Sequence, residues 1–393
     1  MQFAPIAPYQ HDGSFSFKIT EMATELIAKS ASLSGGHTPQ TLDAVKELLY
    51  YVNCYYSNKI ESQGTKPSDI ERAMKKEFSN NEKERNLQIL ALAHLNVQQW
   101  IENRLKSGSV SPYDETFIHE VHKRFYEVDG MEPFRSIDHQ GVIYPVMPGV
   151  YRDKEVEVGR HLAPTPLEVP GLMRTFESLY NATSQNTIPS KIIHALSSHH
   201  RFVWIHPFMD GNGRVSRLML DAAMKHAGIL GYGLWSLSRG LSRSNERYKE
   251  SLSMADQKQM GAYDGRGPLS TKALEEYVEF MLSTCLDQIH YMSRYLRMDT
   301  FASRMQEYIA RSQKKEFDSK PLPDKTSHII HMLLLKGECQ RGELGTLTGI
   351  PDRTMTRILK KLLEHNILQS DSQKGPVRLK ISAHMSGFLF PEI

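Results

Sequence analysis

The segment with the most information is His206-Pro207-Phe208-Met209-Asp210-Gly211-Asn212-Gly213-Arg214-Val215-Ser216-Arg217, in which a helix end, a glycine-rich loop and a helix start follow one another. Pro207 disfavours the α conformation at the residue before it, so the helix expected over residues 189–205 ends at His206. The two glycines allow positive φ and let a ligand approach the backbone closely. A second helix is expected over residues 214–227.

This segment has the parts of a phosphoryl- or nucleotidyl-transfer site. Successive N–H groups that open into a helix N-terminus bind anions, helped by the helix dipole. Arg214 and Arg217 stand three residues apart in the first turn, so both can project toward that anion. Asp210 offers one oxygen ligand of the kind that Mg²⁺ uses when substrate phosphates complete its coordination. His206, a side chain with an ordinary pKa of about 6.5, can accept a proton at neutral pH.

Three other interpretations of the segment are weaker. Asp-Gly-Asn-Gly by itself is usually a turn. An EF-hand fails because Arg214 and Val215 stand at loop positions that need an acceptor and a glycine. A zinc site has neither HExxH spacing nor cysteine support, although several histidines lie nearby: His194, His199, His200 and His206.

Composition limits the class of protein. With 393 residues and 44.9 kDa, two or three domains are expected. A net charge of +3 is too small for a protein that binds nucleic acid or membrane over its whole surface. The three cysteines, Cys54, Cys285 and Cys339, are distant and odd in number, which excludes a disulfide framework. No signal peptide or bilayer-spanning run is apparent, so we expect a cytoplasmic protein without membrane contact.

The rest of the chain is mainly helical in pattern. Apolar residues repeat at helical spacing over residues 41–61 and 86–105. Residues 142–162 alternate short extended pieces with Pro and Gly, which indicates a hairpin or loop. A charged segment with two prolines, residues 314–325, is expected to be a linker.

The last part of the chain, residues 326–393, shows three short helices and then two strands around a Gly-Pro turn. This arrangement resembles a winged helix-turn-helix, whose third helix enters the DNA major groove. Nine Lys and Arg against six Asp and Glu from residue 327 onward leave a modest positive charge. Protein contact or dimerisation is therefore the alternative to DNA binding. The candidate DNA-binding residues are Arg353, Thr354, Arg357 and Lys360.

The opening segment matches every fixed position of the HPFx[D/E]GN[G/K]RxxR signature, and residues 40–310 resemble the Fic (Fic/Doc) family. The resemblance implies that His206 deprotonates a Ser, Thr or Tyr hydroxyl of a target protein. That hydroxyl attacks the α-phosphate of ATP, leaving AMP on the target and releasing pyrophosphate. By the same resemblance Asp210 holds Mg²⁺. Gly213 favours AMP transfer, whereas Lys at that position is typical of relatives that resemble kinases.

The resemblance extends to flanking segments. Residues 155–161, EVEVGRH, resemble the flap hairpin that clamps the extended backbone of the target by strand addition. Tyr248 falls where the family places an aromatic side chain near adenine; a buried core position is the alternative. Asp256 stands where the family often has Asn, so base recognition can differ. The implied ATP-binding residues are Gly211, Asn212, Gly213, Arg214, Val215, Ser216, Arg217, Val158, Gly159, Arg160, His161 and Tyr248.

The end of the first long helix resembles an inhibitory motif of the same family, [S/T]xxxE[G/N]. Ser57 and Glu61 match it, while Ser62 departs from the usual Gly or Asn. The resemblance implies that Glu61 pairs with Arg217 and so removes the partner of the ATP γ-phosphate. In some members of the family the same glutamate helps to remove AMP from the modified target, so de-AMPylation is an alternative activity. Without the resemblance, a Ser and a Glu four residues apart at the end of a helix usually lie on the solvated surface.

We therefore expect a mainly α protein: a Fic-type helical core with a small β-hairpin flap, and a C-terminal winged-helix domain. The expected divisions are residues 1–105 with an inhibitory helix at 41–62, a catalytic core at 106–313, the linker and the winged helix. The expected activity is protein adenylylation with Mg²⁺ and ATP, and a homodimer is plausible for the family. Two alternatives stay open: a nucleotide-sensing DNA-binding regulator, and a transferase that uses another phosphate-containing donor.

Overall fold

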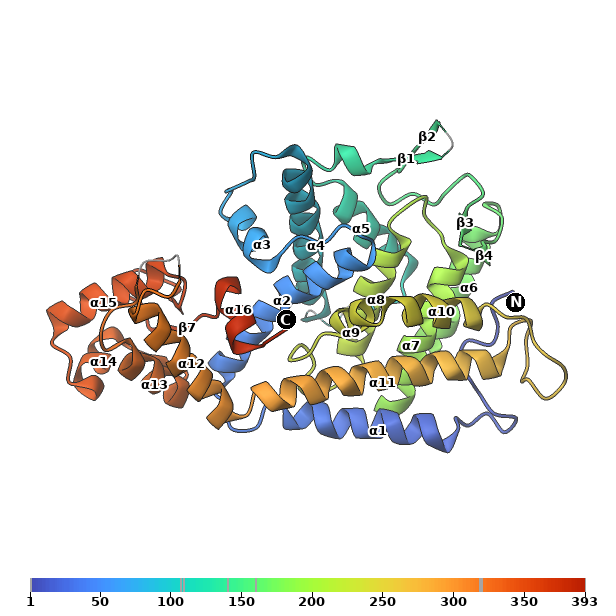
Figure 1. The fold of residues 1–393 in the computed structure, drawn as a ribbon. Helices are drawn as coiled ribbons and strands as arrows, with labels where there is room; N and C mark the ends of the chain where they lie inside the picture. The colour runs from blue at the N-terminus through green and yellow to red at the C-terminus, as the bar shows by residue number, and fades with distance from the viewer. Residues whose placement is uncertain are drawn as a thin grey trace.

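Helices make up most of the computed structural model, which describes residues 2–106, 108, 110–139, 141–159, 161–317 and 321–392 (Figure 1). This confirms the mainly helical fold class. The helices are α1 (Phe17–Ser32), α2 (Pro39–Ile60), α3 (Pro67–Met74), α4 (Glu82–Lys106), α5 (Glu115–Tyr126), α6 (Val169–Asn181), α7 (Ile188–Ile205), α8 (Asn212–His226), α9 (Leu237–Arg243), α10 (Asn245–Ala255), α11 (Thr271–Tyr295), α12 (Met298–Gln313), α13 (Thr326–Lys336), α14 (Arg341–Thr348), α15 (Asp352–Glu364) and α16 (Ala383–Leu389). The strands are β1 (Ser136–His139), β2 (Val142–Pro145), β3 (Glu157–Val158), β4 (His161–Leu162), β5 (Glu338–Cys339), β6 (Leu368–Gln369) and β7 (Val377–Leu379).

The central helices α7 and α8 follow the predicted pattern closely. Pro189 lies in the first turn of α7, and the helix ends at Ile205, where His206 adopts a left-handed conformation with φ +52°. Helix α8 begins two residues earlier than expected, because Gly211 at φ +79° serves as its N-cap. Its last residue is His226, and Gly228 follows with φ +81°.

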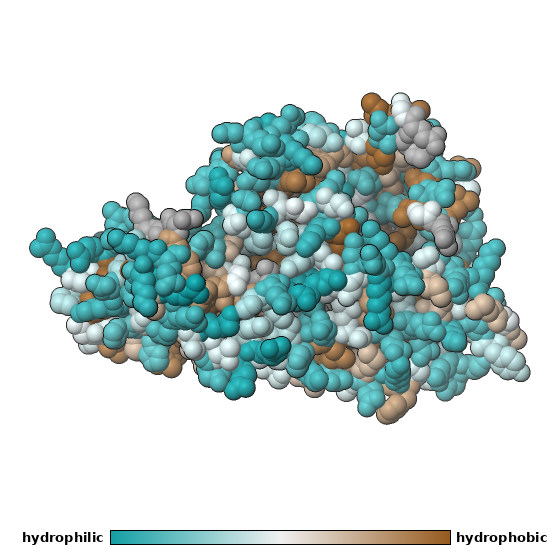
Figure 2. Space-filling view, viewed as in Figure 1, coloured by the Kyte–Doolittle hydropathy of each residue, from teal (hydrophilic) through white to brown (hydrophobic). Residues whose placement is uncertain are grey.

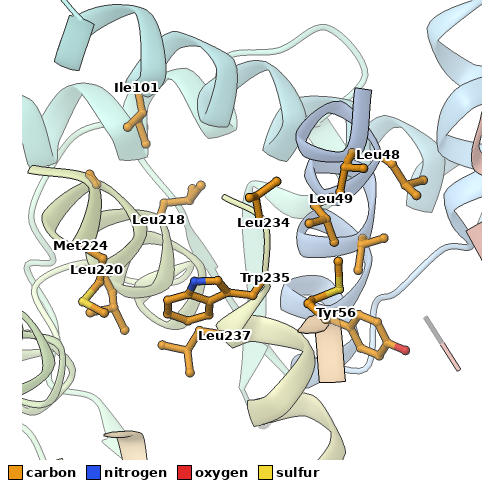
Figure 3. Close-up of a cluster of buried hydrophobic side chains, with 14 of the residues drawn as sticks. Leu48, Leu49, Tyr56, Ile101, Leu218, Leu220, Met224, Leu234, Trp235 and Leu237 are labelled. Atoms are coloured by element: carbon orange, nitrogen blue, oxygen red, sulfur yellow. The ribbon is translucent and has the colours of Figure 1, made fainter. Parts of the chain in front are cut away.

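Helix α2 belongs to the same buried core as α8. Figure 3 shows Leu48, Leu49 and Tyr56 of α2 across from Leu218 of α8 and from Trp235, all of them buried. Full burial of a leucine side chain contributes roughly 1.5–3 kcal/mol. Apolar packing therefore holds the C-terminal half of α2 beside α8 before any polar contact is considered.

The N-terminal segment is also part of the core, which the sequence pattern did not indicate. Phe3 is fully buried, and the carbonyl of Pro5 accepts a hydrogen bond of 2.9 Å from Nε of the buried Arg201. The Tyr9 hydroxyl lies 2.5 Å from Nε2 of His194 on α7. Helices α1 and α11 then run side by side along one edge of the molecule (Figure 1).

Two small hairpins occupy the region where extended structure was expected. Strands β1 and β2 pair antiparallel, and so do β3 and β4. Their apolar side chains include Ile143 at 71% and Leu162 at 69% exposure. Figure 2 shows brown surface on both hairpins at the upper right of the molecule. Each hairpin therefore presents unpaired edges and apolar side chains to solvent.

The C-terminal region has the element order α13, β5, α14, α15, β6, β7, with a three-stranded antiparallel sheet in the order β5-β7-β6. The sequence pattern missed β5 and α16. Helix α16 leaves this region and packs on α12, α3 and α2 (Figure 1). The carbonyl of Glu392 then accepts hydrogen bonds from Tyr56 of α2 (3.1 Å) and Arg239 of α9 (3.2 Å). The tail, residues 383–392, is therefore part of the main body and not of the module that precedes it.

None of the helices in the described ranges combines the length and apolar character needed to cross a bilayer. Cys54, Cys285 and Cys339 are free thiols, and all three are buried.

Candidate active site

The loop between α7 and α8 is held in shape by side chains that close it upon itself. Asn212 is 2% exposed; its Oδ1 accepts from the Phe208 N–H (2.9 Å), and its Nδ2 donates to the Phe208 carbonyl (2.7 Å). The Phe208 ring stacks on His122 of α5 at 3.9 Å. A Cβ on Gly211 would lie 2.8 Å from the Tyr126 hydroxyl, so this position needs glycine for space as well as for φ.

The loop presents the N-terminus of α8 to the site. The first helical hydrogen bond closes from Val215 N to the Gly211 carbonyl at 2.9 Å. The N–H groups of residues 212–214 therefore have no acceptor inside the helix. Three N–H groups at the positive end of a helix dipole make a binding place for phosphate oxygens.

His206 is the candidate proton acceptor of the site. Its Nδ1 lies 3.2 Å from the carbonyl oxygen of Val203, and a carbonyl only accepts, so Nδ1 carries the proton. Burial lowers the pKa of His206 to about 4. The ring is therefore neutral at pH 7, and among the described residues no hydrogen bond uses Nε2, whose lone pair can accept a proton.

Asp210 lies at the other end of the loop with one oxygen engaged. Its Oδ2 accepts from the Tyr126 hydroxyl (2.7 Å) and from Arg214 (3.0 Å). Burial raises the pKa of this carboxyl, but Arg214 and the Tyr126 hydrogen bond outweigh burial and leave the pKa lowered. The side chain is 42% exposed and ionised at neutral pH.

This donor set fits Mg²⁺ only in company with a nucleotide. The described residues contain no cluster of three or more His, Cys, Asp or Glu side chains arranged around a common point. A single ionised carboxylate suits an ion that keeps several waters and takes further oxygens from substrate phosphates. Asp210 is the residue that would hold it.

Arg217 and Glu61 form an ion pair across the site. Arg217 Nη2 lies 2.7 Å from Glu61 Oε1 and also donates to the Ser57 carbonyl (2.9 Å), while its Nε donates to Ser57 Oγ (2.9 Å). Arg217 is 5% exposed, and the Glu61 side chain 36%. Burial raises the pKa of Glu61, but Arg217 and Arg214 outweigh it and lower that pKa. The residues of the implied inhibitory motif therefore contact the arginine that the motif predicts.

The Glu61 carboxylate covers the helix end that would bind phosphate. A Cβ built on Gly213 would overlap Glu61 Oε1. Gln63, two residues further on, accepts from Arg214 at 2.5 Å. The segment after α2 thus contacts Gly213, Arg214 and Arg217 together, at the place where the N–H groups of α8 open.

Several implied nucleotide-binding residues are occupied by other contacts. The Val215 side chain is fully buried and its N–H is used by Gly211. Ser216 donates to the Gly213 carbonyl at 2.8 Å. Tyr248 is 2% exposed, with its hydroxyl 3.2 Å from Nε2 of buried His199. Core packing and helix formation use these groups of Val215 and Ser216, so their nucleotide contacts stay predictions; Tyr248 takes the buried position that was the alternative.

The flap hairpin lies beside the end of α7. Val158 is 44% exposed, and Gly159 adopts φ +64° at the turn; Arg160 lies outside the described residues. His161 Nε2 lies 2.7 Å from the carbonyl of Trp204, two residues before His206. Its Nδ1 lies 3.7 Å from Asp256, which also contacts His200 at 3.2 Å. The flap is therefore anchored next to the candidate base.

Sequence reasoning missed several residues that build this site. Tyr126, His122 and Gln63 hold the loop and the arginines, and Arg152 contacts the end of α7. Their short-range patterns are ordinary, and only distant parts of the chain bring them to the loop. The nearby histidines His194, His199 and His200 are buried, and each forms a hydrogen bond with a different partner: the Tyr9 hydroxyl, the Tyr277 hydroxyl and the Leu252 carbonyl.

Comparison with known proteins gives matches at three levels. Residues 112–224 match the family model described as Fic/DOC family. Protein adenylyltransferase Fic of Drosophila mojavensis is 38% identical over 88 residues, which is 22% of this chain and 17% of that protein. The protein of the same name from Culex quinquefasciatus is 40% identical over 88 residues, 22% and 17% of the two chains. The chain thus spans less than a fifth of these relatives.

Two solved structures share the fold. A Fic family protein from Desulfovibrio desulfuricans G20 has a TM-score of 0.52 at 17% identity, over 95% of this chain and 98% of that one. A Fic domain containing signaling protein from Bacteroides thetaiotaomicron VPI-5482 has a TM-score of 0.54 at 19% identity, over 70% and 98%. The chain therefore contains a Fic/DOC family domain, whose matched residues 112–224 include His206, Asp210, Arg214 and Arg217.

Proposed function

We propose that this protein is a protein adenylyltransferase, which transfers AMP from ATP to a Ser, Thr or Tyr hydroxyl of a target protein. The observation that carries the proposal is the neutral His206, with Nε2 free, beside the N-terminus of α8 and two buried arginines. A sensor of nucleotides needs the arginines but no base. Relatives named protein adenylyltransferase Fic support the choice of reaction.

In this mechanism Nε2 of His206 takes the proton of the target hydroxyl. The hydroxyl oxygen forms a bond to the α-phosphorus as the bond to pyrophosphate breaks. The N–H groups of residues 212–214 and the guanidinium of Arg214 stabilise the charge on the phosphates. Asp210 would hold Mg²⁺, which neutralises phosphate charge when bound. Gly213 has no side chain of its own, so the diphosphate would have room there once the Glu61 carboxylate is displaced.

Glu61 would act as a brake in the same proposal. Its carboxylate occupies Arg217 and lies over Gly213, so a γ-phosphate must displace a negative group to reach that arginine. Charge repulsion between the carboxylate and the phosphate then disfavours the productive position of ATP. Glu61→Gly removes the competing group while leaving α2 packed.

The experiment compares wild type, Glu61→Gly and Glu61→Gly/His206→Ala with α-³²P-labelled ATP and Mg²⁺, and measures label retained on protein after denaturation. We expect label on Glu61→Gly and none on the double variant. ATP binding without label in any variant would refute adenylyl transfer. Repeating the assay with labelled UTP and CTP tests whether another donor takes its place.

The C-terminal module supports a second proposal, DNA binding by residues 326–381. Its element order suits a winged helix, and its α15 buries Met355, Ile358 and Leu359 while exposing Arg353, Arg357 and Lys360; Thr354 is half-buried. A duplex oligonucleotide titrated at several salt concentrations tests it. Loss of two phosphate contacts in Arg353→Ala/Arg357→Ala lowers the salt slope by about 2. Lys29→Ala on α1 is the control, and absence of binding at low salt favours a protein partner.

A further inference from the structure

Arg152 has an unusual set of partners for a buried guanidinium. It is 3% exposed and lies in the loop between β2 and β3. Within the described ranges its recorded hydrogen bonds go only to backbone carbonyls, and no carboxylate lies within ion-pair distance. Such an arrangement places a full positive charge where the backbone alone must satisfy it.

One side of Arg152 contacts the end of α7. Its Nε donates to the His206 carbonyl at 2.7 Å, and Nη2 lies 3.5 Å from the Ile205 carbonyl. Its backbone N–H donates to the Pro207 carbonyl at 2.9 Å. The last carbonyls of a helix lack partners and carry the negative end of the dipole. Arg152 therefore caps α7 and holds the residue that departs from helical geometry.

The other side of Arg152 contacts both legs of the flap. Nη1 donates to the Lys154 carbonyl at 2.9 Å, and Nη2 donates to the Pro164 carbonyl. Strands β3 and β4 lie between these two residues. The planar guanidinium group of Arg152 thus connects the start of the flap, the end of the flap and the backbone of His206.

We propose that Arg152 is a positioning residue of the transfer reaction: it holds His206 in its left-handed conformation and fixes the flap hairpin at a set distance from it. The inference rests on the proposed function, because a flap that holds the target peptide must present the hydroxyl to Nε2 of His206. Misplacing reacting groups by about 1 Å costs roughly 100-fold in rate.

Arg152→Lys and Arg152→Gln in the Glu61→Gly background separate the geometry from the charge. Lysine keeps the charge but cannot bridge several carbonyls, and glutamine loses both. We expect transfer to fall roughly 10–100-fold in both variants. The Kd for ATP should change much less than the rate of transfer does, because the expected phosphate contacts lie on α8 and not on the flap. Arg304→Gln is the matched control, since that arginine also donates to backbone carbonyls, those of Phe388 and Leu389.

The pH profile distinguishes positioning from general damage to the fold. The titratable or charged groups that act on His206 are Arg152, His161 and Asp210. Losing the Arg152 charge raises the pKa of His206, so the acid limb of transfer moves to higher pH in Arg152→Gln and stays in place in Arg152→Lys.

Two measurements judge the inference even if adenylyl transfer fails altogether: amide hydrogen exchange of residues 156–163, and NMR titration of His206. Faster exchange and a raised His206 pKa in Arg152→Gln support it. The inference is overturned if flap exchange, His206 titration and transfer all match the parent. It is equally overturned if ATP affinity and thermal stability fall in parallel with transfer, because that pattern marks a purely structural role.

Discussion

Replacing Glu61 by glutamine tests how much the ion pair with Arg217 holds the site closed. The oxygen and nitrogen are 2.7 Å apart, which puts the charge centres about 4 Å apart. At an effective dielectric constant of about 20 such a pair is worth about 4 kcal/mol. Because Glu61 is 36% exposed, solvent screening reduces this to about 2 kcal/mol. This is roughly a 30-fold effect on ATP affinity, at 1.4 kcal/mol per factor of ten.

We therefore expect Glu61→Gly to bind Mg²⁺–ATP about 30-fold more tightly than wild type. Glu61→Gln, which keeps a neutral acceptor for Arg217, should gain about 10-fold. Isothermal titration with a non-hydrolysable ATP analogue gives both values, and Glu25→Gln on α1 is the control for an exposed glutamate in a surface pair.

Comparing Ser57→Ala, Glu61→Gln and Glu61→Gly separates the effect of the Glu61 charge from the effect of its side-chain volume. Ser57→Ala removes one hydrogen bond to Arg217 Nε but leaves the Ser57 carbonyl and Glu61 in place. Its effect should stay within about threefold. If Glu61→Gln binds the nucleotide no better than wild type while Glu61→Gly does, the brake acts through bulk and the electrostatic reasoning is refuted.

Three further predictions concern the loop, the tail and pH. Asn212→Ala leaves the Phe208 N–H and carbonyl without their partner, so unfolding free energy should fall by about 1–3 kcal/mol and transfer should be lost; urea denaturation measures the first and label incorporation the second. Arg239→Ala removes the arginine's hydrogen bonds to the Glu392 carbonyl and to Gln288 and leaves only Tyr56 on that carbonyl, so limited proteolysis should remove the C-terminal tail faster while the ATP Kd stays constant. Burial lowers the pKa of four histidines to about 3 or 4, so the folded state excludes protons that the unfolded state binds below pH 6.5. The contribution of these histidines to the free energy of unfolding is therefore fully present above pH 6.5. It falls by about 1.4 kcal/mol per histidine per pH unit as the pH drops toward the folded-state pKa values. Thermal melts from pH 7.5 to 5.5 check this, and an unchanged melting temperature would contradict it. These histidines are His94, His122, His199 and His206.

Local sequence patterns were sufficient to predict structure where the residues that determine it are neighbours in the chain. Pro207 predicted the end of α7, and the glycine-rich loop predicted the start of α8 to within two residues. The helical spacing over residues 41–61 predicted α2, whose structure runs from Pro39 to Ile60. The resemblance to an inhibitory motif predicted a contact between Glu61 and Arg217 that joins residues 156 positions apart.

Long-range packing decided the rest. Val215 and Ser216 stand beside Arg214 in sequence, yet helix geometry turns their groups into the core. Arg152 has no motif around it, and the positioning role proposed for it depends on four backbone carbonyls, two beside the flap and two at the end of α7. Backbone carbonyls carry no sequence signature, because every residue has one.

The sequence by itself determined the residue types of the site, since proton transfer and phosphate binding need particular side chains at particular spacings. Only the tertiary structure decided which of them are free and which are already engaged. That distinction depends on burial and on hydrogen bonds between distant segments, such as Tyr126 on Asp210 and Gln63 on Arg214. A buried polar group without a partner destabilises the fold, so each of these groups must find a hydrogen bond. The partners come from distant segments of the chain and not from the same motif.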